Sequence, residues 1–294
     1  MNDFAEDDSR KRLRTIWITG AGGLIGNYLV QTAKHFAPDF KVVGLTRSDL
    51  DLLDFPSVRQ RFHKEKPQAV IHCAAMSQSP ACQKQPALAR QVNVGVTALL
   101  AELSADIPFV FFSTDLVFDG RKGDYVETDE VNPLSIYAET KVAAEKIVMA
   151  NPKHTIVRTS LNGGISPSGN RGFNEQLRNA FRSDETVTLF TDEFRSPIPA
   201  SATTRAVWEL IGKNLAGLFH IAGGEKLSRW QIGKLIAGRC LELNPKLKPE
   251  SLVNYHGAPR SPDTSLNCAK VQAHLSFALP GLSEWLSHCP EPAF

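Results

Sequence analysis

The stretch TIWITGAGGLIG, residues 15–26, decides the fold of this 294-residue chain. Thr15–Thr19 is rich in β-branched and aromatic residues, which is typical of a buried strand. It runs directly into four glycines within seven residues, and Asn27–Phe36 follows with apolar residues on one helical face. A strand, a glycine loop and a helix in this order present free backbone N–H groups and the positive end of a helix dipole, which suit a pyrophosphate.

The spacing of the glycines indicates a separate task for each of three positions. Gly20 would allow the tight turn, Gly23 would let phosphates approach the backbone, and Gly26 would let the helix pack on the strand. The main spacing is GxxGxxG, whereas the usual dinucleotide fingerprint is GxGxxG. A tight strand–helix turn without a ligand is the other interpretation of the same string.

Apolar runs and helical patterns alternate as far as residue 158. Continuous apolar strands separated by helices indicate a parallel sheet that is covered on both faces. The fold class is therefore α/β, a Rossmann-type doubly wound parallel sheet with a smaller carboxy-terminal substrate lobe. Strands are predicted at 15–19, 41–45, 69–74, 108–113 and from 155, and helices at 27–36, 86–105 and 137–150.

The same patterns predict how the chain divides. Residues 1–13 are polar and charged and form a flexible tail. Residues 14–160 form the dinucleotide-binding domain, and residues 161–294 form mostly the substrate-binding lobe. Within that second part, 201–222 returns to the sheet domain as a helix and a strand.

Composition excludes several classes of function. The chain has 33 Lys and Arg against 31 Asp and Glu. A net charge of +2 argues against nucleic-acid binding, which needs a strongly basic surface. No run of about 18 apolar residues could span a membrane, and the charged start lacks the apolar core of a signal peptide. Five scattered cysteines indicate reduced thiols, and no Cys/His cluster has zinc spacing. We therefore expect a cytoplasmic protein without a metal site.

The residues after the second strand bear on the choice of cofactor. NAD sites place an Asp or Glu there to hold the ribose 2′-hydroxyl, whereas an Arg accommodates the 2′-phosphate of NADP. Here the run is Gly44-Leu-Thr-Arg47, so NADPH is favoured and NADH stays open. Arg47 as a solvated surface charge is the other interpretation. Asp54 could accept from the adenine amino group or could cap a helix that starts at Phe55.

Tyr137 and Lys141 lie four residues apart on a predicted helix and hence on one face. A phenol with a pKa near 10 is a poor acid at neutral pH, and a nearby ammonium would lower that pKa toward the working range. Upstream, Ser113 and Thr114 follow a buried strand, at the edge where open α/β sheets bind ligands. A hydroxyl there could polarise a carbonyl while Tyr137 exchanges the proton, although a Tyr/Lys pair alone is common on exposed helix faces.

These motifs together resemble the extended short-chain dehydrogenase/reductases. They are the glycine string, HCAA at 72–75, STDLVFDG at 113–120 and YAETK at 137–141. STDLVFDG and the chain length are most similar to the dTDP-4-dehydrorhamnose reductase group. The likeness covers nearly the whole chain after the tail and includes, in the family's order, VRTSLNGG (157–164), EFRSPIPA (193–200), GLFHIAGG (217–224) and SLNCAKVQ (265–272).

The resemblance implies roles for individual residues. Tyr137 would be the general acid, and Lys141 would lower its pKa and hold the nicotinamide ribose. Thr114 would bind the keto oxygen, with Ser113 as the less favoured candidate, and Asn93 would support Lys141 through water. The hydride belongs to the cofactor. The same resemblance implies that the cofactor is bound, besides Lys141, by Gly20, Gly23, Leu24, Ile25, Gly26, Arg47, Asp54, Ala74, Ala75 and Tyr137.

Some positions depart from the family's pattern. Leu116 stands where the group usually has Tyr, and His72 replaces a more usual Asn. His72 falls within a predicted strand, so a satisfied core histidine is favoured over a catalytic base. The stretch Met76–Pro80 differs from that of the rhamnose enzymes, which leaves the sugar open. Arg195 and Arg171 could each contact a substrate diphosphate from the carboxy-terminal lobe, or each could equally be a surface arginine; Arg195 is the predicted substrate contact.

The predicted function is NADPH-dependent reduction of a nucleotide-activated 4-keto-6-deoxysugar, with hydride from the cofactor and the proton from Tyr137. Dehydratases of the superfamily carry an Asp-Glu pair after the catalytic Thr, and Leu116 replaces that Glu here, which disfavours dehydration. A nucleotide-sugar epimerase usually favours NAD, which Arg47 argues against. A non-catalytic NADP-binding subunit that resembles the regulatory subunit of methionine adenosyltransferase is a further alternative. The expected partner is a small-molecule nucleotide sugar, not a nucleic acid or a membrane, and a homodimer stays open.

Overall fold

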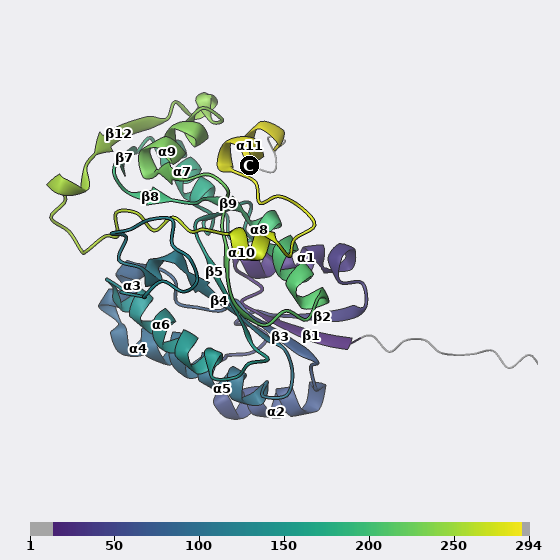
Figure 1. The fold of residues 1–294 in the computed structure, drawn as a ribbon. Helices are drawn as coiled ribbons and strands as arrows, with labels where there is room; N and C mark the ends of the chain where they lie inside the picture. Colours follow the sequence, from purple (N-terminus) through teal and green to yellow (C-terminus); the bar gives the residue numbers. More distant parts are fainter. Residues whose placement is uncertain (1–13, 290–294) are drawn as a thin grey trace, which may run out of the picture.

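A computed structural model describes residues 14–289, and its main layer is a six-stranded parallel sheet (Figure 1). The strand order is β10-β5-β4-β3-β1-β2. From β1 the sheet extends to β2 on one side and to β3, β4 and β5 on the other, and doubly wound sheets bind ligands where the strand order reverses in this way. The predicted α/β class with a parallel sheet is confirmed. The strands span Arg14–Thr19 (β1), Phe40–Leu45 (β2), Ala69–His72 (β3), Phe109–Thr114 (β4), Thr155–Thr159 (β5) and Gly217–Ile221 (β10).

Side chains alternate between two apolar cores along each central strand. On β1, Ile16 and Ile18 face the core shared with α1 and α8, while Trp17 faces the core beneath α2, α5 and α6. Figure 1 shows these two helical layers on opposite sides of the sheet. Because both faces are covered, the central strands β3 and β4 are buried along their whole length and are mostly apolar. The helices span Leu24–Phe36 (α1), Phe55–Glu65 (α2), Val96–Leu103 (α5), Ile136–Met149 (α6) and Ala200–Gly212 (α8).

The prediction of one regular helix over 86–105 is wrong, because a π-helical turn interrupts it. α4 (Pro86–Arg90) passes into a π-helical turn, Gln91–Gly95, before the chain continues as α5. A π-turn places one extra residue in a helical turn, and such turns are frequent at functional sites. Apolar periodicity does not reveal it, because the apolar face continues on both sides of the turn.

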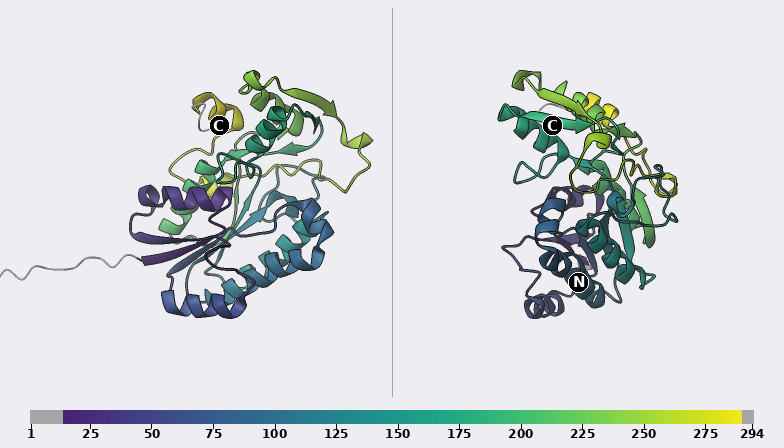
Figure 2. Two further views of the ribbon diagram at one scale, coloured as in Figure 1. Left: turned by 180° about the vertical axis from the view of Figure 1, so that it is seen from behind. Right: turned by 90° about the vertical axis from the view of Figure 1, so that its left-hand side faces the viewer.

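The carboxy-terminal lobe has its own apolar core, which α7, α9 and α11 share with Leu227. Figure 2 shows the lobe stacked on one end of the sheet layer. The lobe elements are α7 (Phe173–Arg182), α9 (Arg229–Ala237) and α11 (Leu282–His288), with the strand pairs β7 (Thr186–Phe190) and β12 (Lys246–Glu250), β8 (Phe194–Arg195) and β11 (Leu227–Ser228), and β6 (Asn162–Gly163) and β9 (Ile198–Pro199).

Two further short helices complete the fold, α3 (Ser79–Lys84) and α10 (Ala269–Gln272). β10 pairs with β5, and α8 packs against α1, so this part of the carboxy-terminal half joins the sheet layer. The division into 14–160 and 161–294 stays a prediction, and the predicted tail 1–13 lies outside the described residues. Within 14–289, no helix is both long and apolar enough to cross a bilayer.

Candidate active site

The glycine loop packs tightly against the loop that follows β3. Gly20 has a φ of +69°, and a Cβ there would come within 2.7 Å of the Ala74 backbone nitrogen. A Cβ on Gly26 would lie 2.3 Å from the carbonyl oxygen of Gly20. α1 begins at Leu24 behind Gly23, without a side-chain cap. The loop is therefore a bare-backbone cradle at a helix N-terminus, the geometry that suits a pyrophosphate.

The end of β2 presents Arg47 to solvent. Arg47 is exposed, and its guanidinium forms no ion pair with the residues that the structure describes. The nearby Asp49 is engaged in the turn, because its carboxylate accepts from the Thr46 amide at 2.9 Å. Asp54 caps α2 by accepting from the Ser57 amide at 3.2 Å and the Ser57 hydroxyl at 2.6 Å. The capping role of Asp54 is confirmed, and its contact to adenine stays a prediction.

Thr114, Tyr137 and Lys141 meet at the carboxyl end of β4. Thr114 is the last residue of β4, and Tyr137 lies in the first turn of α6, which Ser135 caps. The Thr114 and Tyr137 side chains are hydrogen-bonded. Lys141 is one turn further along α6, is 3% exposed, and places its Nζ 3.9 Å from the centre of the Phe111 ring. The structure thus brings the three predicted catalytic residues to the edge where this fold binds ligands.

Two polar groups at this edge are available to a ligand. The buried Ser113 hydroxyl has no hydrogen-bond partner among residues 14–289, and the Lys141 ammonium lies over the Phe111 ring. Burial lowers the pKa of Lys141 to about 7, and the Glu145 carboxylate opposes that shift. A buried polar group without a partner costs about 1–3 kcal/mol, and more when it is charged. These groups therefore fit a ligand that brings hydroxyl or carbonyl oxygens, such as a ribose.

In the structure the pKa of Tyr137 is raised, and the lowering of that pKa by Lys141 stays a prediction. Burial is the largest cause acting on the phenol and raises its pKa, and the Asp115 carboxylate raises it further. The hydrogen bond with Thr114 acts in the opposite direction and lowers it. The phenol is therefore held in its protonated form, which is the form that a general acid needs.

Asn93 lies in the π-turn and joins two parts of the site. Its Oδ1 accepts from the Met76 amide at 2.8 Å, and its Nδ2 donates to the Thr140 hydroxyl at 2.9 Å. The asparagine amide thus ties the loop after β3 to α6, the helix that carries Lys141. The water-mediated support of Lys141 stays a prediction, whereas the direct contacts of Asn93 could not be read from the sequence.

His72 is a satisfied core histidine, as predicted. Its Nδ1 lies 2.7 Å from the Thr19 hydroxyl, and its Nε2 lies 3.1 Å from the Thr97 hydroxyl. The side chain is 1% exposed, and burial lowers its pKa to about 3. Both ring nitrogens are occupied, so His72 does not act as a base here.

Arg195 lies close to Asp115, which follows β4, and its guanidinium already contacts carboxylates. Its Nη2 donates to Glu193 Oε1 at 3.0 Å, and its Nη1 lies 3.7 Å from Asp115 Oδ2. Arg229 has a guanidinium without a hydrogen bond to the described residues, and burial lowers its pKa to about 10. Arg171 is exposed on the loop before α7. The contact of Arg195 to a diphosphate stays a prediction, and Arg229 is a neighbouring arginine that sequence reasoning missed.

The model of a known family, described as the RmlD substrate binding domain, matches residues 14–292. The chain belongs to this family. A probable low-salt glycan biosynthesis reductase of Haloferax volcanii, Agl14, is 31% identical over 75% of the chain and 78% of the relative. Subunit beta of methionine adenosyltransferase 2 from Rattus norvegicus is 26% identical over 92% of the chain and 85% of the relative.

Among solved structures, a dTDP-4-dehydrorhamnose reductase of Bacillus anthracis in complex with NADP has the same fold. Its TM-score is 0.83, with 24% identity over 93% of this chain and 97% of that one. The resemblance to the dTDP-4-dehydrorhamnose reductase group is thereby confirmed. Within this RmlD-like family, relatives with different names, a probable reductase and a methionine adenosyltransferase subunit, share most of the length of the chain.

The RmlD-like chain also holds a site residue to which sequence reasoning assigns no role. The sequence marks Asp115 only as half of an incomplete Asp-Glu pair, yet it contacts Thr114, Ser160, Thr264 and Arg195. Its position next to Thr114 is the available signal. Its partners lie up to 149 residues away along the chain, so only the fold reveals them.

Proposed function

We propose that this protein is an NADPH-dependent reductase of a nucleotide-activated 4-keto-6-deoxysugar and acts in the cytoplasm. The observation that carries the proposal is the convergence of Thr114, Tyr137 and Lys141 at the carboxyl end of β4, beside the glycine cradle. NADPH fits the residues present on three counts. The cradle has no room for side chains at Gly20 and Gly26, the Ser113 hydroxyl lacks a hydrogen-bond partner among the described residues, and Arg47 is unpaired there.

In such a reaction, some residues of this chain would bind the cofactor and others would act on the substrate carbonyl. The glycine cradle and Arg47 would hold the phosphates, and Lys141 would bind the ribose hydroxyls. When bound, the cofactor supplies the hydride. Thr114 would orient the keto oxygen, and Tyr137 would donate the proton that this oxygen takes as the carbonyl becomes an alcohol. A positioned acid of this kind contributes about 10²–10⁴ in rate.

The test is NADPH oxidation by the purified protein with a panel of nucleotide 4-keto-6-deoxysugars. Turnover of a panel member supports the reductase and identifies its substrate class. Tight NADPH binding without turnover of any member contradicts it. That second result would favour the alternative of an NADP-binding regulatory subunit, because a subunit of methionine adenosyltransferase matches 92% of this chain. A pull-down that recovers a stoichiometric partner would then distinguish that role.

Replacing Arg47 tests the choice of cofactor. Arg47→Gln should weaken NADPH binding by about tenfold or more, because a charge-assisted contact to the 2′-phosphate is worth roughly 1.5–3 kcal/mol. NADH binding should stay unchanged, since NADH has no 2′-phosphate. Fluorescence titration of both cofactors measures the two affinities. Lys34→Gln removes another exposed cation, at the far end of α1, and should affect neither. Equal losses for NADPH and NADH would contradict the assignment.

Replacing Gly26 tests the cradle. Gly26→Ala should reduce NADPH affinity at least about tenfold, because the new Cβ would lie 2.3 Å from the Gly20 carbonyl oxygen and must displace the loop. Gly22→Ala is the matched control, since its Cβ would meet only a Thr46 methyl at 3.8 Å. Isothermal titration with NADPH compares the two variants. If both bind NADPH as the unsubstituted protein does, the loop is a structural turn and not the phosphate site.

A further inference from the structure

A buried path of hydrogen bonds connects the glycine cradle with the catalytic helix α6. Its polar side chains come from β1, β3, the π-turn, α5 and α6, and none of them is more than 1% exposed. They are Thr19, His72, Asn93, Thr97 and Thr140. Buried polar groups need hydrogen-bond partners, and each of these side chains finds them in another member of the path or in the backbone of the site.

The first end of the path holds the loop after β3 against the cradle. Thr19 is the last residue of β1 and directly precedes Gly20. Its hydroxyl accepts from the Ala74 amide at 3.3 Å and lies 2.7 Å from His72 Nδ1. Gly20 packs against the same Ala74 nitrogen, since a Cβ on Gly20 would come within 2.7 Å of it. The spacing between cradle and loop therefore depends on Thr19.

The second end of the path reaches the backbone of Tyr137. The Thr97 hydroxyl donates to the Asn93 carbonyl at 2.7 Å. Asn93 Nδ2 donates to the Thr140 hydroxyl at 2.9 Å, and that hydroxyl donates to the Tyr137 carbonyl at 2.7 Å. Asn93 thus carries the path from α5 to the first turn of α6, where Tyr137 lies.

His72 joins the two ends, and its neighbours determine which ring nitrogen carries the hydrogen. A hydroxyl has only one hydrogen. Thr97 gives its hydrogen to the Asn93 carbonyl, so it accepts from His72 Nε2, 3.1 Å away. His72 Nε2 therefore carries the hydrogen, and Nδ1 accepts from the Thr19 hydroxyl. Burial lowers the pKa of His72 to about 3, which keeps the ring neutral.

We propose that His72 is a positioning residue whose Nε2–H tautomer holds the glycine cradle and α6 at a fixed spacing. The proposal rests on the proposed function, in which the cradle binds NADPH and Tyr137 supplies the proton. Reduction needs the cofactor and the acid to be aligned on one carbonyl, and a misplacement of about 1 Å can cost about a hundredfold in rate. Because its ring is buried and both nitrogens are engaged, His72 acts only through Thr19 and Thr97.

Nitrogen NMR of the isotope-labelled protein without ligand tests the tautomer. Long-range proton–nitrogen correlations distinguish the two neutral tautomers, because protonated and unprotonated ring nitrogens resonate far apart. Triple-resonance experiments assign the His72 signals. At neutral pH we expect an uncharged ring with its hydrogen on Nε2. A cationic ring, or a hydrogen on Nδ1, would overturn the proposal.

Thr97→Val tests the positioning role. It removes the acceptor of His72 Nε2 and leaves the contacts of the His72 ring with Phe109 and Phe111 in place, which a substitution of His72 itself would not. NADPH affinity should fall about fivefold, the order of one lost buried hydrogen bond. The kcat of NADPH oxidation at saturating NADPH should fall by a similar factor. Fluorescence titration and steady-state kinetics measure the two effects.

Two control variants separate the hydroxyl from packing. Thr155→Val makes the same change in another buried threonine, whose hydroxyl donates to the Leu215 carbonyl at 2.9 Å at the amino end of β5. It should leave NADPH affinity and kcat unchanged. Thr97→Ser keeps the hydroxyl and should keep both values as well. Unchanged NADPH affinity in Thr97→Val contradicts the proposal, and so does an equal loss in either control.

The outcomes for His72 and for the proposed function are distinguishable. If the unsubstituted protein turns over no panel member, the proposed function fails, whereas the tautomer and the NADPH titrations still decide on His72. If Thr97→Val does not fold, Thr19→Val interrupts the path on the other side of the ring and is judged by the same loss of NADPH affinity.

Discussion

Tyr137→Phe should lower NADPH-dependent carbonyl reduction by about a thousandfold while NADPH affinity stays within about twofold. The substitution removes only the phenolic hydroxyl, which is hydrogen-bonded to Thr114 at the end of β4. The proton that the keto oxygen needs would then have to come from water, which is not held in place. Steady-state kcat with the best panel substrate, together with NADPH titration, separates the catalytic loss from a binding loss.

The matched control is Tyr125→Phe. Tyr125 is a buried tyrosine stacked on Phe118, and its hydroxyl donates to Asp119 at 2.9 Å. Its removal should cost about 1 kcal/mol of stability and leave kcat unchanged. If Tyr137→Phe keeps full turnover, the proton has another source, and the role of Tyr137 is wrong even if the protein is a reductase.

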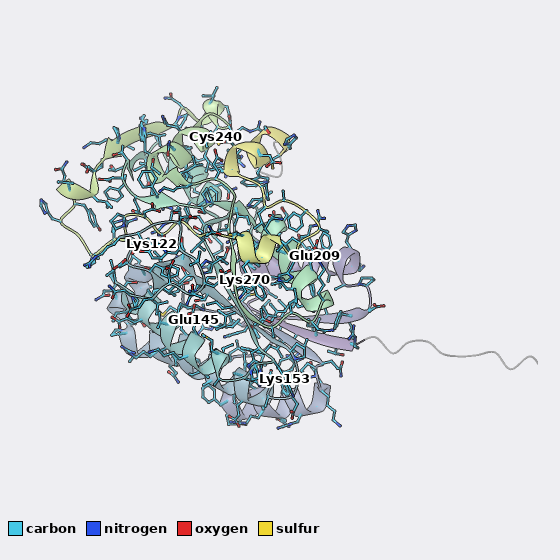
Figure 3. All side chains as sticks on the ribbon, viewed as in Figure 1. Lys122, Glu145, Lys153, Glu209, Cys240 and Lys270 are labelled. Atoms are coloured by element: carbon cyan, nitrogen blue, oxygen red, sulfur yellow. The ribbon has the colours of Figure 1, made fainter. Side chains whose placement is uncertain are left out.

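Arg158→Met should destabilise the protein by about 3–5 kcal/mol, on the order of a 10 °C fall in Tm. Arg158 of β5 and Glu145 of α6 form a two-pronged ion pair, with Nε to Oε1 at 2.9 Å and Nη2 to Oε2 at 2.7 Å. Both side chains are only 4% exposed, and Figure 3 labels Glu145 in the α6 layer. Without Arg158, the Glu145 carboxylate stays buried without its partner, one helical turn from Lys141.

Two further variants test whether the loss of stability comes from the unpaired Glu145 carboxylate or from breaking any ion pair. The double variant Arg158→Met/Glu145→Leu should recover most of the lost stability, because it buries no unpaired charge. Arg59→Ala breaks a pair with Glu102 whose side chains are 43% and 62% exposed, and it should cost no more than about 1 kcal/mol. Urea unfolding of these variants and the unsubstituted protein measures the differences. A double variant as unstable as Arg158→Met would show that packing, not the unpaired carboxylate, causes the loss.

The sequence alone was sufficient for the fold class and for the location of the site. Thr15–Thr19 and the glycines after it encode a strand, a tight turn and a helix in consecutive residues, so no distant contact is needed to recognise them. The spacing of Tyr137 and Lys141 has the same local character, because helical geometry by itself places them on one face. The capping of α2 by Asp54 was also readable, since donor and acceptor are three residues apart.

Only the tertiary structure decided how the polar groups of the site are used. The partners of Asp115 come from the segment after β5, from β8 and from the segment before α10, and Thr264 lies 149 residues away from it. The direction of the Tyr137 pKa depends on burial and on Asp115, whereas the sequence suggested only Lys141. The sequence predicts Arg195 as a substrate contact, whereas the fold pairs its guanidinium with two carboxylates. Secondary structure follows from neighbouring residues, but hydrogen bonding and charge in a buried site depend on which distant segments the fold brings within a few ångströms.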